Sequence, residues 1–125
     1  MLNKLQGPAL LRIALGILFL VPGLAKLMDP GMITGMLSGL GFPVAPLFAW
    51  ILILVEIICG ALLIIGFKTE IAIWPLFVVL LVALLLVAIP SFDASKVDTI
   101  MALLWHLVGL AGLLSINSTG PGKLF

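Results

Sequence analysis

One apolar stretch with a single carboxylate near its centre constrains this chain more than any other feature. Residues 47–66 read LFAWILILVEIICGALLIIG, and Glu56 is the one charged residue among them. A helix of this length crosses the hydrocarbon core of a bilayer at a rise of about 1.5 Å per residue. A carboxylate at the centre of such a helix is costly unless it is protonated, paired or directed into a wet interior. The side chains around Glu56 therefore decide how the chain can fold.

The composition is that of an integral membrane protein. Hydrophobic residues make up 64% of the sequence and charged residues 9%, whereas soluble domains carry about 25% charged residues. The net charge is +1 and no basic run occurs, which argues against nucleic-acid binding. Cys59 is the only cysteine, so an intrachain disulfide and a cysteine metal site are excluded. We predict no metal site.

Four segments are predicted to cross the membrane, with approximate bounds of residues 8–28, 44–66, 71–90 and 99–116. The segment between the first two, DPGMITGMLSGLGFP, is too short and glycine-rich to cross. Its apolar residues nevertheless recur at helical spacing, and Asp29 can cap a helix there, so we predict a short interfacial helix. The predicted fold is an all-α membrane protein, a four-helix up-and-down bundle, with residues 1–125 forming one domain.

The distribution of basic residues predicts that both termini are cytoplasmic. That side of the membrane would then hold Lys4, Arg12, Lys68 and Lys123. The opposite side would hold Lys26 and Lys96, so the positive-inside rule favours this orientation. We expect the protein in the cytoplasmic (inner) membrane of a prokaryote. Its expected partners are the lipid bilayer and other membrane protein subunits.

Three of the four segments carry polar and small residues on one helical face. These faces are Arg12, Gly16, Phe19, Gly23 and Lys26; Ala49, Ile53, Glu56, Gly60 and Leu63; and Thr99, Ala102, His106, Gly109 and Leu113. Small residues let membrane helices approach closely, and polar side chains face the bundle interior. The predicted helix-packing residues are Gly16, Gly23, Gly60 and Gly109. The third segment has no such face, so we expect it to pack on the outside of the other three.

We predict a buried polar cluster, for ligand binding or for structure, that consists of Arg12, Glu56, His106 and Lys26. Glu56 and His106 lie at similar depth, and the long side chain of Arg12 can reach inward toward Glu56. Two interpretations stay open, a structural ion pair that fixes helix register and a ligand site. His106 is either a hydrogen-bonded interior histidine or a proton carrier. One histidine cannot supply both axial ligands of a b-type haem, and we assign no catalytic residue.

A set of motifs runs in order along nearly the whole chain. It comprises Arg12, Gly16, Gly23 and Lys26; the tripeptide at residues 41–43; Glu56 with Gly60; Gly66 followed by Lys68 and Thr69; and the closing Gly120, Pro121 and Gly122. Their order and spacing resemble the DoxX family of small four-helix membrane proteins. The resemblance implies a relation to the membrane subunits of thiosulfate:quinone oxidoreductase and favours a respiratory or quinone-linked role. It supplies no set of catalytic residues.

Three functions are compatible with these residues. The first is an accessory or structural subunit of a larger membrane redox or respiratory-type complex, not catalytic on its own and with no assigned cofactor. The second is a quinone-binding oxidoreductase subunit in which Arg12, Glu56 and His106 hold the quinone head group and exchange its proton. The third is a carrier of a small anion, with Arg12 and Lys26 as the anion contacts.

Overall fold

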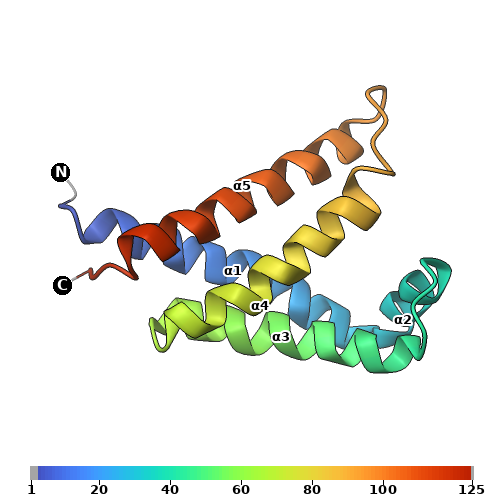
Figure 1. The fold of residues 1–125 in the computed structure, drawn as a ribbon, viewed down its shortest axis with the longest axis horizontal. Coiled ribbons are helices and arrows are strands. Elements are labelled where there is room, and N and C mark those ends of the chain that lie inside the picture. The colour runs from blue at the N-terminus through green and yellow to red at the C-terminus, as the bar shows by residue number, and fades with distance from the viewer. Residues whose placement is uncertain (1–2, 125) are drawn as a thin grey trace.

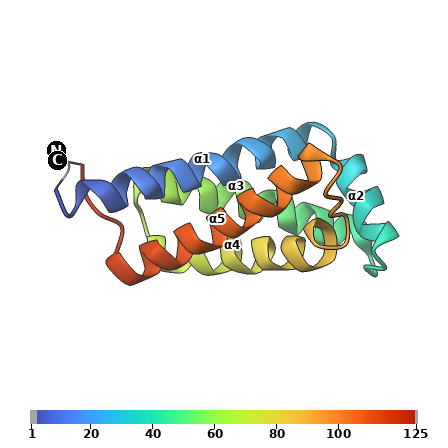
Figure 2. The ribbon, with the colours of Figure 1, turned by 90° about the horizontal axis from the view of Figure 1, so that it is seen from above.

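A computed structural model describes residues 3–124 of the chain (Figures 1 and 2). Its elements are α1 (Gln6–Met28), α2 (Pro30–Gly39), α3 (Ala45–Ile65), α4 (Thr69–Ala83), the π-helical turn η1 (Leu84–Ala88) and α5 (Val97–Thr119). Among the described residues, four helices, with α4 and η1 counted as one, are long and apolar enough to cross a membrane. Within residues 3–124 no strand occurs. The predicted all-α membrane fold, including the short helix between the first two spans, is confirmed.

Helices α1 and α3 lie side by side and antiparallel (Figure 1), and glycines bring them close. A Cβ atom added to Gly16 would lie 2.7 Å from the carbonyl oxygen of Gly60, and one added to Gly60 would lie 2.9 Å from the backbone nitrogen of Leu20. Helices in lipid associate through close packing, because the surrounding chains are as apolar as the helices themselves. The glycines therefore determine which residues of α1 and α3 face each other.

Helix α2 packs on the start of α3. The backbone N–H of Met32 donates to Oδ1 of Asp29 at 3.3 Å, so Asp29 caps the helix as predicted. The buried side chains of Ile33 and Leu37 lie in one hydrophobic cluster with Ala45 and Ala49 of α3. This contact holds α2 across the end of the bundle that is remote from the termini (Figure 1).

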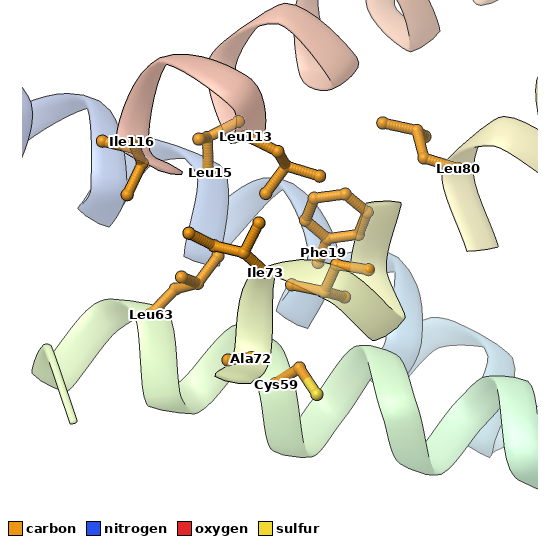
Figure 3. Close-up of a cluster of buried hydrophobic side chains, with 10 residues drawn as sticks. Leu15, Phe19, Cys59, Leu63, Ala72, Ile73, Leu80, Leu113 and Ile116 are labelled. Carbon is orange, nitrogen blue, oxygen red and sulfur yellow. The ribbon is translucent and has the colours of Figure 1, made fainter. Parts of the chain in front are cut away.

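Helix α4 forms part of the core, and the prediction that the third span packs outside is wrong. Its Ala72, Ile73, Leu76 and Leu80 are buried among side chains of α1, α3 and α5. Figure 3 shows Ile73 near the middle of this cluster, close to Leu113 of α5 and Phe19 of α1, and Leu80 at its edge. The helix is apolar on every side, so its sequence does not indicate which side faces inward. The packing of its neighbours decides that.

Candidate functional site

Glu56 pairs with Lys26 across the contact between α1 and α3. The Nζ atom of Lys26 lies 2.5 Å from Oε1 of Glu56. Glu56 is only 4% exposed, so the lysine supplies its counter-charge inside the bundle. Gly23, one turn before Lys26, allows this approach, because a Cβ atom there would lie 3.0 Å from the Cβ of Glu56. Arg12 was a candidate partner of Glu56 in the predicted cluster, but the structure has Lys26 in that role.

The second carboxylate oxygen of Glu56 is buried and has no hydrogen-bond partner among residues 3–124. Buried polar atoms in proteins nearly always have one, so an orphaned oxygen requires a physical explanation. A carboxylate oxygen can accept a hydrogen bond from a water or from a hydroxyl of a bound molecule, or it can carry a proton itself. The pair of Glu56 and Lys26 thus has unused capacity to bind a ligand.

Arg12 binds the carboxyl end of α3. Its Nη1 donates to the carbonyl oxygens of Leu63 at 2.6 Å and Ile64 at 3.1 Å, and its Nε donates to that of Pro121 at 2.8 Å. The last four carbonyls of a helix lack partners within the helix and carry partial negative charge, which a guanidinium satisfies. Leu63 lies roughly 10 Å along α3 from Glu56 at 1.5 Å per residue. Distance thus separates Arg12 from the carboxylate.

The segment after α5 completes this junction, a role that was not predicted from the sequence. The backbone N–H of Lys123 donates to the carbonyl of Leu5 at 2.8 Å, and Nε2 of Gln6 donates to the carbonyl of Leu124 at 3.1 Å. Gly122 lies directly against Leu5 and Ala9, where a Cβ atom would collide with backbone. The glycine and proline motif at residues 120–122 was the sequence feature that could have indicated this role. Through this motif the segment after α5 packs against α1.

His106 is buried, at 7% exposure, and hydrogen bonds within its own helix. Its Nδ1 lies 2.5 Å from the carbonyl oxygen of Ala102. A carbonyl only accepts, so Nδ1 is the protonated donor of this hydrogen bond. In the described part of the chain no hydrogen bond links His106 to Glu56 or Arg12. The predicted cluster thus divides into the Glu56 and Lys26 pair, the Arg12 junction and a separate histidine.

The structure also contains an apolar pocket of about 280 Å³ between α2, α3 and the α4–η1 helix. Its walls are hydrocarbon or thioether side chains, among them Met36, Phe48, Leu52, Val79 and Leu86. At its α4 wall the backbone makes the wider π-turn, in which the N–H of Ile89 donates to the carbonyl of Leu84. Insertions of this kind in helices are frequent at functional sites. Across residues 3–124, no three His, Cys, Asp or Glu residues are grouped to hold a metal ion.

Comparisons with known proteins agree with this architecture. Residues 7–89 match the sequence model of the DoxX family. The chain is also 34% identical, over 129 aligned positions, to a protein of Mycobacterium tuberculosis described as an uncharacterized membrane protein. That alignment covers 90% of this chain and 74% of the relative. No solved structure matches the chain.

Proposed function

Because the chain belongs to the DoxX family of membrane proteins, we propose that it is an accessory membrane subunit of a larger redox complex of respiratory type. The relation of this family to the membrane subunits of thiosulfate:quinone oxidoreductase supports the redox assignment. The observation that carries the proposal is the apolar pocket between α2, α3 and α4–η1. In this proposal a transmembrane helix of a partner subunit packs against it.

The pocket has the properties of a helix-packing surface. Its rim consists of side chains that are 38–56% exposed, including Phe48, Ile51 and Val78. In a membrane, exposed apolar side chains alone do not drive association, because lipid satisfies them equally well. A hollow between helices is different, because its lining gains dispersion contacts when a protruding side chain fills it. Met36 adds a flexible side chain that adapts to the shape of a partner.

A variant that fills the pocket tests this proposal. Val79→Trp introduces a large side chain at the pocket wall, whereas Val108→Trp makes the same change on α5, at a side chain that is 67% exposed and outside the pocket. Each protein is extracted into native nanodiscs, and co-purifying haem, flavin or iron–sulfur absorbance is measured. We expect Val79→Trp to reduce retention of the redox partner roughly tenfold, an effect of about 1.4 kcal/mol. Val108→Trp should leave it unchanged.

Two results would contradict the proposal. One is recovery of the wild-type protein solely as an isolated monomer or homodimer. The other is equal retention of the redox partner by the two tryptophan variants, because a partner whose retention does not change when the pocket is filled does not bind at the pocket.

Quinone binding is a second candidate function, and the orphaned oxygen of Glu56 favours it. A quinol hydroxyl could donate to Oε2 of Glu56. Lys26 has three N–H donors, of which the one to Oε1 is the hydrogen bond present, so another can donate to a quinone carbonyl. A carboxylate in this position can exchange a proton with the head group while a redox cofactor of another subunit in the complex exchanges electrons with the quinone. In this version of the proposal Glu56 and Lys26 hold the head group, and Arg12 takes no part because it binds α3.

The test of quinone binding is the variant Glu56→Gln. It keeps the shape of the side chain but removes the proton acceptor, so we expect quinol-linked turnover of the complex to fall about 100-fold or more, the usual contribution of a general base. Its dependence on pH should be lost as well. Asp98→Asn, an exposed acid in the first turn of α5, serves as the control. Unchanged turnover and pH dependence in Glu56→Gln would eliminate this function.

The anion-carrier hypothesis requires Arg12 and Lys26 to contact one anion. They lie 14 positions apart on α1, which corresponds to about 21 Å along a helix. Lys26 is in addition paired with Glu56. We therefore do not retain the anion carrier as a proposal.

A further inference from the structure

We propose that Arg12 and Lys123 form a binding site for a phosphate group at the end of the bundle where both termini lie. The site is a second pocket, of about 380 Å³, between α1, the end of α3 and the segment after α5. Gly66 and residues 121–124 form part of its wall, and Arg12 and Ile64 form another part. A water molecule occupies about 30 Å³, so the pocket has room for a phosphate group.

Arg12 has donors to spare at this pocket. A guanidinium carries five N–H groups, and those on Nε and Nη1 serve the carbonyls of Leu63, Ile64 and Pro121. Its Nη2 atom donates to no acceptor within residues 3–124. Nη2 is also not enclosed by protein, so it remains accessible from the pocket that Arg12 lines. Because the planar guanidinium suits phosphate oxygens well, a phosphate group is the natural acceptor for Nη2.

The charge of the pocket also favours an anion. Lys123 lines it together with Arg12, and no acidic residue lies among the described residues of its wall. The carboxyl end of α3 would by itself repel an anion, because helix carbonyls carry partial negative charge there. The carbonyls of Leu63 and Ile64 are, however, already bound by Arg12. Two positive side chains therefore act on whatever enters the pocket.

The surroundings place this site at the membrane surface. Arg12 lies six positions after the first residue of α1, about 9 Å along the helix. Ile65, which is 70% exposed, forms part of the pocket wall, so cationic and apolar groups adjoin as they do beside a phospholipid headgroup. The phosphate can belong to an anionic lipid or to a small soluble molecule. The chemistry recognised is the same in both cases.

The experiment compares Lys123→Glu with Lys4→Glu in the full chain. Both lysines are exposed and lie at the same end of the molecule, but only Lys123 lines the pocket. The backbone N–H of Lys123, and not its side chain, makes the hydrogen bond to Leu5, so neither variant should unfold. In nanodiscs of phosphatidylcholine with phosphatidylglycerol, native mass spectrometry counts the phosphatidylglycerol molecules retained. In phosphatidylcholine alone, titration with inorganic phosphate measures binding of the free anion.

We expect Lys123→Glu to weaken binding at least about fivefold, because one lysine near a membrane surface contributes about that factor. Lys4→Glu should match the wild type. An effect specific to Lys123 in the lipid arm identifies a headgroup as the ligand, and one confined to the phosphate arm identifies a soluble phosphate. Equal losses in the two variants, or no binding in either arm, would overturn the proposal.

Discussion

Replacing Lys26 by methionine is expected to destabilise the protein by about 3–5 kcal/mol, the usual cost of removing one partner from a buried ion pair. The substitution leaves the carboxylate of Glu56 inside the bundle without the Nζ that lies 2.5 Å from it. Glu56 cannot turn to water, because it is 4% exposed and packed against Gly23 of α1. The free energy of unfolding can be measured by steric trapping in bicelles.

The double variant Lys26→Met with Glu56→Gln separates the ion pair from general packing. Because it removes both charges, we expect it to recover most of the stability that Lys26→Met loses. Lys96→Met, at an exposed position in the loop before α5, controls for the loss of a positive charge. If Lys26→Met were as stable as the wild type, Glu56 would have to be neutral or otherwise compensated in the bundle.

Replacing Arg12 by methionine is expected to cost roughly 3–5 kcal/mol as well, since an unsatisfied buried polar group costs about 1–3 kcal/mol and three carbonyls lose their donor. These belong to Leu63, Ile64 and Pro121. The end of α3 and the segment after α5 should loosen together, because the arginine joins them. Hydrogen exchange is the appropriate measurement, and the amides of Gly120 and Lys123 should lose protection.

Two variants control this second prediction. Arg12→Lys keeps the charge but has all its donors on one nitrogen, whereas Arg12 binds its three carbonyls from Nε and Nη1. An intermediate stability is therefore expected. Lys4→Met removes an exposed charge at the same end of the molecule and should have little effect. Unchanged protection at Gly120 and Lys123 in Arg12→Met would mean that the contact of Gly122 with α1 holds the segment without the arginine.

Helical spacing was sufficient to predict which side of α3 faces inward. Ala49, Ile53, Glu56, Gly60 and Leu63 are all buried. The prediction was correct because a charged side chain and a small residue lie on the same face of the helix. The charge is costly in lipid, and the small residue lets another helix pack closely, so both face the bundle interior. Helix α4 offers no such contrast. Its buried Ile73 and Leu76 are chemically indistinguishable from the exposed Ile71 and Val78, so the sequence could not place it.

The sequence by itself determined the four spans and the need for a partner to Glu56, because hydrocarbon tolerates neither an unpaired backbone nor an unpaired charge. Only the tertiary structure decided which cation fills that role. In an antiparallel pair, residues later in α1 meet residues earlier in α3. The contact between Gly16 and Gly60 sets that register. It places Arg12 at the end of α3 and brings Lys26 to Glu56, because the backbones approach each other where neither carries a side chain.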